Sequence, residues 1–373
     1  MVKTYNFIFV VFFALLLASC NKKDDETTAG TDSFRKDLLT NVGNNIIVPG
    51  YQELNSKVDI MDMAVKEFQS NPTASTLNAA RNTFKDAYRA WQKTSVFEFG
   101  PAEVQLLRES VNTFPTNTEQ IHSNIASGTY NLGSANNFKA KGFPALDYLL
   151  YGLGENDDAI LEKYIIDEGS ENRLAYLEAV SKDIKSNTNV VLEAWSTNGG
   201  NYINTFVNAT GTANGSSLSK LVNQLNYDYE LIKNPKIGIP LGKRTLGEKL
   251  PGHVEAYYSG ISKELTLLNV KAIENIYLGR SAQGMAGTGL DDYLVQLDAK
   301  YNGGSLSEAI KEQLTKVKAS IEQLPDPLSG AIVNNSSLVE AAYTEIQKTV
   351  VMLKTDMPSA MSVQIDYVDN DGD

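Results

Sequence analysis

The sequence is poor in the side chains that build most disulfide and zinc sites. Its 373 residues include one cysteine, Cys20, and two histidines, His122 and His253. A single cysteine excludes a disulfide framework and any metal site made of several thiolates. Two histidines nearly exclude sites at which two imidazoles and a third ligand converge.

Positive charge is also scarce. Lys and Arg together number 33, against 45 Asp and Glu, which gives a formal net charge of −12. A protein that binds nucleic acid needs a basic surface to neutralise phosphates, so we expect no nucleic-acid partner. The sequence also lacks H-E-x-x-H and G-x-S-x-G patterns, which leaves a conventional zinc peptidase or serine hydrolase without support.

The amino terminus has the pattern of an export signal. Lys3 precedes an apolar run at residues 7–18, shorter than the ~20 residues of a membrane span. The run ends in a segment that resembles a bacterial lipobox, Leu17-Ala18-Ser19-Cys20. We therefore expect residues 1–19 to be a signal peptide and Cys20 to carry the lipid of an outer-membrane anchor. The alternative is an ordinary secretion signal with a chance cysteine.

Polar residues follow the cysteine at once. Residues 20–32 contain a Lys-Lys-Asp-Asp-Glu run and small polar side chains, which predict a solvated, lipidated tether. The order of lysines and then acids resembles the signal that sends some bacterial lipoproteins to the cell surface. Linker solubility is the alternative interpretation of the same charges.

Strand signals are nearly absent, apart from an alternation at Val363, Ile365 and Tyr367. Elsewhere apolar residues recur every three or four positions, which places one apolar stripe on each helix. The clearest stripes lie at residues 77–91, 174–195, 254–276, 306–324 and 339–353. Long helices with such stripes bury them against one another in bundles, so we predict an all-α fold.

A Gly/Asn/Ser/Thr-rich stretch without helical periodicity divides the chain at residues 196–217. The chain also exceeds the roughly 250–300 residues at which a single core usually divides. We therefore expect an N-terminal helical bundle at 33–197, a connection at 198–217 and a C-terminal bundle at 218–373 with a short acidic tail. The two bundles would pack around an interdomain cleft.

Three segments combine aromatic, glycine and acidic residues in an unusual way. The first leads from Trp91 through Glu98 to a Gly-Pro helix stop, the second is residues 142–152, and the third is residues 251–262. In the third we predict the start of a long helix, on which Glu255, Ser259 and Ser262 at i, i+4 and i+7 share one face. Such a polar stripe beside an apolar one would line the cleft.

Together these segments resemble the imelysin family, exported bacterial helical proteins grouped historically with a peptidase. The resemblance rests on W-Q…F-x-F-G-P, on G-F-x-x-x-x-Y-L-L-x-G, on the 236–242 loop and on E-x-x-Y-S-G-x-S, and it covers most of the mature chain. It implies two helical bundles with a site between them, centred on a G-x-H-x-x-E motif. It also implies iron or another metal uptake as the setting.

The motif is degenerate in this chain. Gly142 matches, but Pro144 stands at the histidine position and Asp147 at the glutamate position. Proline cannot bind a metal, whereas it fits the first turn of a helix. The helix dipole favours an acid near the same end, so a structural role and a ligand role for Asp147 both stay open.

We predict that Asp147, Glu98 and Glu255 are oxygen donors for a hard cation, either a divalent metal or iron. The remaining candidates are second partners of the same cleft. Arg244 would serve as a counterion, Ser259 and Ser262 as orienting hydroxyls, and Trp91 as a cleft side chain or a core residue.

Three functions are compatible with these residues. The first is a lipid-anchored, ligand- or metal-binding component of iron uptake at the cell envelope, acting with an iron-uptake receptor. The second is an imelysin-type metallopeptidase, which needs a metal-bound water and a general base and is disfavoured by the degenerate motif. The third is a metal-free descendant that binds a partner protein or glycan through the same cleft.

Overall fold

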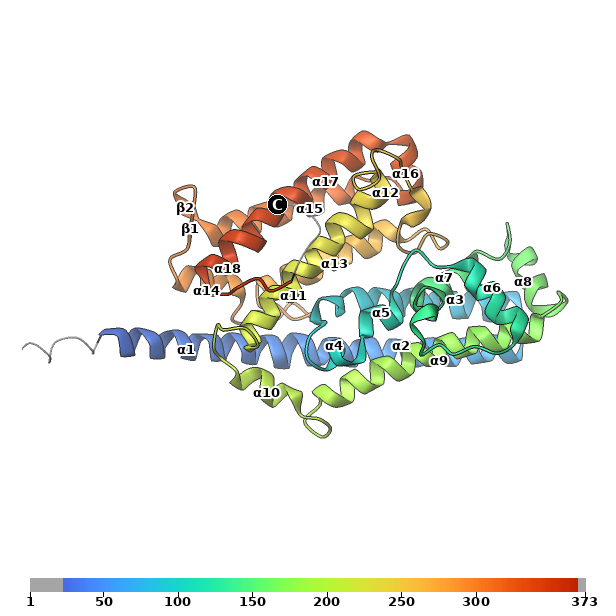
Figure 1. Cartoon of the computed structure of the whole chain (residues 1–373), viewed down its shortest axis with the longest axis horizontal. Helices are drawn as coiled ribbons and strands as arrows, with labels where there is room; N and C mark the ends of the chain where they lie inside the picture. Colours follow the sequence, from blue (N-terminus) through green and yellow to red (C-terminus); the bar gives the residue numbers. More distant parts are fainter. Residues whose placement is uncertain (1–22, 368–373) are drawn as a thin grey trace, which may run out of the picture.

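The computed structural model describes residues 23–367, and it confirms the all-α prediction (Figure 1). In chain order the α-helices are α1 (Lys23–Asn41), α2 (Val48–Ser70), α3 (Ala74–Gln92), α4 (Pro101–Gln105), α5 (Leu107–Val111), α6 (Thr118–Ser127), α7 (Gly142–Tyr151), α8 (Asp157–Ile165), α9 (Ser170–Trp195), α10 (Tyr202–Asn208), α11 (Ser217–Leu231), α12 (Ile239–Leu241), α13 (Ser262–Tyr277), α14 (Leu290–Gln296), α15 (Leu306–Glu322), α16 (Leu328–Asn334), α17 (Ser336–Val351) and α18 (Met357–Ala360).

Shorter segments with other hydrogen-bond spacings join these helices. The 3₁₀ segments are η2 (Ser95–Phe97), η3 (Ala135–Ala140) and η5 (Pro251–His253), and the π-helical segments are η1 (Val42–Ile47), η4 (Ile232–Gly238) and η6 (Met352–Asp356). A two-stranded antiparallel hairpin, β1 (Lys300–Tyr301) and β2 (Gly304–Ser305), is the whole sheet content of the described residues. The alternation at 363–367, which suggested a strand, is not in a sheet.

The N-terminal helices pack around α2, which lies between α3 and α9. The Thr73 side chain caps α3 by accepting from the backbone N–H of Thr76, which fixes where the helix begins. From there Leu77, Phe84 and Trp91 point into the core and are fully buried. The predicted stripe at 77–91 therefore is the buried face of α3. Helix α7 closes the group by packing on both α3 and α9.

The C-terminal helices form a second group, in which α15 lies between α13 and α17. Figure 1 shows this group, yellow to red, beside the blue-to-green N-terminal helices. The two groups meet where α13 packs on α3 and where α11 packs on η2. Their buried apolar side chains form one continuous cluster. The two-bundle prediction holds, and the junction between the bundles is a packed interface that encloses polar residues.

The stretches predicted to be a tether and a connection both contain helix. Residues 23–32, predicted to be a tether, form the first turns of α1. The 198–217 connection contains α10, which packs on α1 and α9 because Ile203 and Phe206 are buried there. Glycine-rich flanks hid this short helix from the periodicity.

Some predictions fall on residues that the structure does not describe. The signal peptide at 1–19, the lipidation site Cys20 and the acidic residues at 368–373 lie outside the described range. Among residues 23–367, no helix is both long and apolar enough to cross a membrane.

Candidate binding site between the bundles

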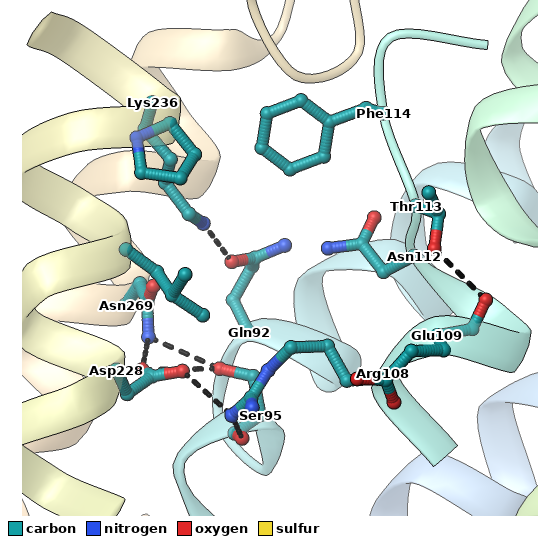
Figure 2. A pocket seen from close by; sticks show the side chains of 12 residues that line it. Gln92, Ser95, Arg108, Glu109, Asn112, Thr113, Phe114, Asp228, Lys236 and Asn269 are labelled. Carbon is teal, nitrogen blue, oxygen red and sulfur yellow. Dashed lines mark hydrogen bonds and ion pairs between the residues drawn. The ribbon is translucent and has the colours of Figure 1, made fainter. Parts of the chain in front are cut away.

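A cavity of about 170 Å³ lies at the junction of the two helix groups (Figure 2). The N-terminal group contributes Gln92 at the end of α3, Ser95 in η2, Arg108 and Glu109 in α5, and residues 112–114 after α5. The C-terminal group contributes Asp228 from α11, Lys236 from η4 and Asn269 from α13. The cavity is therefore built by segments that are far apart in the sequence.

Lys236 lies in a locally distorted helix that places it in the cavity wall. Segment η4 is π-helical and contains Pro235, which has no N–H to donate to the preceding turn. The wider turn continues α11 and keeps Lys236 buried, with 5% of its surface exposed. Single π-helical turns inside α-helices are frequent at functional sites.

The first polar network of the site centres on Glu255, of which 1% is exposed. Lys236 Nζ lies 2.8 Å from Glu255 Oε2, and it also donates to the side-chain oxygen of Gln92. Glu255 Oε1 accepts from Gln92 Nε2 at 2.9 Å and from Asn112 Nδ2 at 2.8 Å. Tyr88 Oη extends the network by donating to Asn112 Oδ1 at 2.7 Å, and burial together with the charge of Glu255 raises the pKa of Tyr88.

The second network centres on Asp228, which is equally buried. Arg108 Nη2 lies 3.2 Å from Asp228 Oδ1, while Asn269 Nδ2 donates to Asp228 Oδ2 at 2.6 Å. Ser95 Oγ lies 3.3 Å from the same oxygen. Figure 2 shows Arg108, Ser95 and Asn269 gathered around Asp228, on the other side of Gln92 from Lys236.

Charge is nearly balanced in this cavity. Each buried carboxylate faces one cation, as Glu255 faces Lys236 and Asp228 faces Arg108. Buried charges are tolerated when they are paired and hydrogen-bonded in this way. The wall offers ammonium, guanidinium, amide and hydroxyl groups together with carboxylate oxygens. A molecule that enters therefore meets both signs of charge within a small volume.

The predicted three-acid metal site does not form. Asp147, Glu98 and Glu255 make separate sets of contacts, and within residues 23–367 no group of three or more His, Cys, Asp or Glu side chains is placed to hold a metal ion. Periodicity and spacing could not reveal this, because the partners of each acid come from other segments of the chain.

The carboxylate of Asp147, at the degenerate motif position, accepts hydrogen bonds from two backbone N–H groups. Its Oδ2 accepts from the N–H of Tyr258 at 2.8 Å, and its Oδ1 accepts from the N–H of Ser259 at 3.0 Å. Burial raises the pKa of Asp147 to about 6, although the hydrogen bonds from Ser259 and Tyr258 lower it. Asp147 and Pro144 border a hollow of only about 40 Å³, too small for an organic ligand.

Glu98 closes a turn instead of facing the cavity. It follows η2, and its Oε1 accepts from the backbone N–H of Arg108 at 3.0 Å. Burial raises the pKa of Glu98 to about 7, while the nearby charge of Arg108 lowers it. Its carboxylate thus ties η2 to the start of α5.

The segment before α13 is not the start of a long helix, contrary to the prediction for residues 251–262, and only its 3₁₀ segment η5 is helical. Residues 254–260 form turns, Ala256 has a φ of +51°, and α13 begins only at Ser262. Glu255, Ser259 and Ser262 therefore do not form a stripe. Ser262 Oγ donates to the carbonyl of Glu255, and Ser259 contributes its N–H to Asp147. The glycine and proline residues in this segment were the available warning signal.

The two remaining candidates lie away from the cavity. Trp91 is fully buried in the hydrophobic core, so the core alternative describes it. Arg244 is exposed in the turn after α12 and does not line the inter-bundle cavity.

Sequence reasoning missed the polar residues of the cavity, among them Gln92, Arg108, Asn112, Asp228 and Lys236. Gln92 and Lys236 lay inside segments already singled out, but nothing marked them as partners of Glu255. Asp228 offered a weak signal, because it follows a series of apolar positions in α11 at helical spacing. Their meeting depends on how the two bundles dock.

Comparisons with known proteins agree with this architecture. A peptidase M75 family model described as imelysin matches residues 47–353. Iron-regulated protein A of Synechococcus elongatus is 22% identical over 288 residues, covering 76% of this chain and 74% of that protein.

Two solved structures have a similar fold. One, from Parabacteroides distasonis and described as an iron-regulated protein A precursor, gives a TM-score of 0.73 at 17% identity, covering 88% of this chain and 95% of its own. The other, an imelysin-like protein from Psychrobacter arcticum, gives a TM-score of 0.69 at 18% identity, covering 90% and 98%.

Proposed function

This chain belongs to the imelysin family, and from that premise we propose that it is an exported, lipid-anchored binding protein of iron uptake at the cell envelope. Two of its relatives are described as iron-regulated, and one of these as a precursor, which supports an iron-related, exported protein. The lipobox-like segment ending at Cys20 supports attachment to the outer membrane. The partner is an iron-uptake receptor in the same membrane.

The ligand site of this proposal is the cavity between the bundles, and its paired charges carry the argument. The Lys236–Glu255 and Arg108–Asp228 pairs both reach this space. Two cations in the wall repel a bare metal ion, and Asp228 with Glu109 repels a simple anion. A small organic zwitterion, of the amino-acid or dipeptide class, satisfies both signs at once.

The metallopeptidase alternative receives no support from the described side chains. Catalysis of that type needs several metal ligands and a general base. Pro144 supplies neither, and both carboxylate oxygens of Asp147 accept backbone N–H groups. We therefore assign binding, and not peptide cleavage, to this site.

Calorimetric titration of the purified mature chain tests the ligand assignment. The probes are the individual protein amino acids, glycylglycine and ferric citrate. We expect a zwitterion to bind the wild type and Val104→Trp, whose position is 86% exposed. Binding should weaken at least about tenfold in Thr113→Trp, where the new ring enters the cavity from its wall. Absence of zwitterion binding, or binding that Thr113→Trp leaves intact, contradicts the assignment.

Metabolic labelling tests the anchor separately. Cells expressing the full chain should incorporate labelled palmitate into it and retain it in the outer-membrane fraction. Cys20→Ser should abolish both the label and the membrane retention, because no other thiol exists in the chain. A Cys20→Ser protein that remains labelled would remove the lipoprotein part of the proposal.

A further inference from the structure

The two polar networks of the inter-bundle cavity differ in whether their hydrogen-bonding atoms have partners. Beside Glu255, the side-chain nitrogens and oxygens of Gln92 and Asn112 all have partners. Beside Asp228, Arg108 Nε and Asn269 Oδ1 are buried without a partner among residues 23–367. A buried donor or acceptor without a partner costs free energy. The Asp228 end is therefore where a ligand can supply missing hydrogen bonds.

The unpartnered donor and acceptor belong to neighbouring side chains that both line the cavity. Arg108 Nη2 lies 3.2 Å from Asp228 Oδ1, and Asn269 Nδ2 lies 2.6 Å from Oδ2 of the same carboxylate. Figure 2 shows both side chains beside Asp228. A cation and an acceptor that reach one carboxylate suit a molecule whose own two charges are attached to one carbon atom. An α-amino acid is such a molecule.

Apolar side chains complete the wall. Phe114, Leu231 and Pro235 line the cavity, and each is half-buried. Leu231 follows Asp228 by three positions on α11, so the two side chains share one face of that helix. A ligand whose charged groups lie beside Asp228 therefore has an apolar surface next to them. Covering this surface with an apolar ligand side chain removes it from water, which favours binding.

The cavity volume limits the size of the ligand. The volume is about 170 Å³, and an engineered cavity of about 150 Å³ holds one benzene molecule. An amino acid with a short aliphatic side chain is of comparable size. Tryptophan and dipeptides are considerably larger.

We propose that the inter-bundle cavity is selective for a free α-amino acid with a small aliphatic side chain, of which valine is the representative. The ligand carboxylate binds the guanidinium of Arg108, and the ammonium group donates to Asn269 Oδ1. The side chain packs on Leu231, which is thereby a specificity-determining residue. This inference rests on the proposed function, because it narrows the zwitterion assigned there to one class.

Calorimetric titration of the purified mature chain tests the selectivity. The probes are glycine, L-alanine, L-valine, L-aspartate, L-lysine, L-tryptophan and β-alanine, each alone. Valine should bind at least about tenfold more tightly than glycine, because each added methyl group enters an apolar pocket. Aspartate, lysine and tryptophan should bind at least about tenfold more weakly than valine. β-Alanine, whose two charges are one carbon further apart, should bind more weakly than L-alanine.

Two variants separate the apolar wall from the charged end. Leu231→Ala should lower the ratio of valine to glycine affinity at least about fivefold. Asn269→Leu removes the acceptor and should weaken glycine and valine alike. Leu192→Ala, at a half-buried leucine of α9 outside the cavity lining, is the matched control and should change neither affinity. Circular-dichroism melts of each variant establish that it is folded.

The outcomes distinguish this inference from the proposed function. If glycine, aspartate, lysine and valine bind equally well, or if Leu231→Ala leaves the valine-to-glycine ratio unchanged, the selectivity is overturned while the zwitterion assignment stands. If no zwitterion binds the wild type, both fall. A valine preference that Leu231→Ala reduces and Leu192→Ala preserves supports the inference.

Discussion

The buried carboxylates near the bundle junction are accommodated in two different ways. Glu255 and Asp228 pair directly with the cations Lys236 and Arg108, which line the inter-bundle cavity. Asp147 and Glu98 instead accept backbone N–H groups of neighbouring segments. All four are at most 7% exposed, so burial alone does not distinguish them.

The difference lies in what each acid holds in place. The Arg108–Asp228 pair joins the two bundles, whereas Glu255 pairs with Lys236 of its own bundle and is joined to the N-terminal bundle by hydrogen bonds from Gln92 and Asn112. Both pairs leave charged groups in the cavity wall. A carboxylate that accepts backbone N–H groups fixes a turn and faces no cation of the cavity. Asp147, which occupies the position of the motif glutamate, belongs to the second kind, and it holds residues 258–259 against α7.

Breaking the Lys236–Glu255 ion pair should have the largest effect on the unfolding free energy. In Lys236→Met, Glu255 stays buried without its cation, and we expect the free energy of unfolding to fall by about 3–5 kcal/mol. Denaturant unfolding measures this loss. Lys243→Met, which removes an exposed ion pair with Glu340, should cost less than about 1 kcal/mol. Equal effects of the two variants would contradict the role of the pair, and Lys236→Met/Glu255→Gln should recover part of the loss.

The carboxylates that accept backbone N–H groups should make the unfolding free energy depend on pH. The pKa of Glu98 is about 7 in the folded chain, above its ordinary value of 4.5. The folded state therefore holds the Glu98 proton more tightly, so the stabilising contribution of this group is fully present below about pH 4.5 and is lost as the pH rises to about 7. The loss is on the order of 3 kcal/mol at most.

Unfolding midpoints at about pH 5 and about pH 7.5 test this linkage. Glu98→Gln should show a smaller difference between the two pH values than the wild type. The exposed Glu103 is the matched position, so Glu103→Gln should keep the wild-type difference. Asp147, with a pKa of about 6, contributes with the same sign and leaves some pH dependence in Glu98→Gln.

Removing the Asp147 carboxylate, which accepts two backbone N–H groups, should lower the unfolding free energy by an intermediate amount. Asp147→Ala leaves the N–H groups of Tyr258 and Ser259 without their acceptor, at a cost of about 2 kcal/mol in unfolding free energy. Hydrogen exchange at these two amides should also accelerate. Asp158→Ala, at an exposed position in α8, is the control. Unchanged exchange at residues 258 and 259 would show that Asp147 does not hold this segment.

The smallest effect on the unfolding free energy is expected at Arg244, which belongs to neither kind of carboxylate contact. Arg244→Ala alters an exposed turn, and its unfolding free energy should stay within about 0.5 kcal/mol of the wild type. Calorimetry with the zwitterion probes should likewise be unchanged. A clear loss of zwitterion binding in Arg244→Ala would show that Arg244 belongs to the binding site.

Much of the fold could be predicted from local patterns. The stripe at 77–91 identified the buried face of α3, and the glycine-rich stretch marked the region where the chain passes between the bundles. The prediction that a long helix begins at residues 251–262 was wrong. It followed the helical spacing of apolar residues, which continues past Pro251, Gly252 and Gly260 into α13. Local backbone preferences there outweighed the helical period.

The site was less accessible to prediction. Glu255 was predicted to be an oxygen donor for a cation in the cleft, but its observed partners Lys236, Gln92 and Asn112 come from η4, α3 and the segment after α5. No spacing rule connects these positions. Glu98 and Asp147 have the same residue chemistry and almost the same burial, yet their contacts give them a different role.

By itself the sequence determined the helices, their buried faces and the family resemblance, because side-chain periodicity and turn chemistry are local properties of the chain. Only the tertiary structure decided which acids face cations and which accept backbone N–H groups. Two of those contacts join segments more than a hundred residues apart, Arg108 with Asp228 and Asp147 with Tyr258. The charge state and chemistry of each acid follow from such contacts, since the electrostatic environment of a buried carboxylate is set by its neighbours in space.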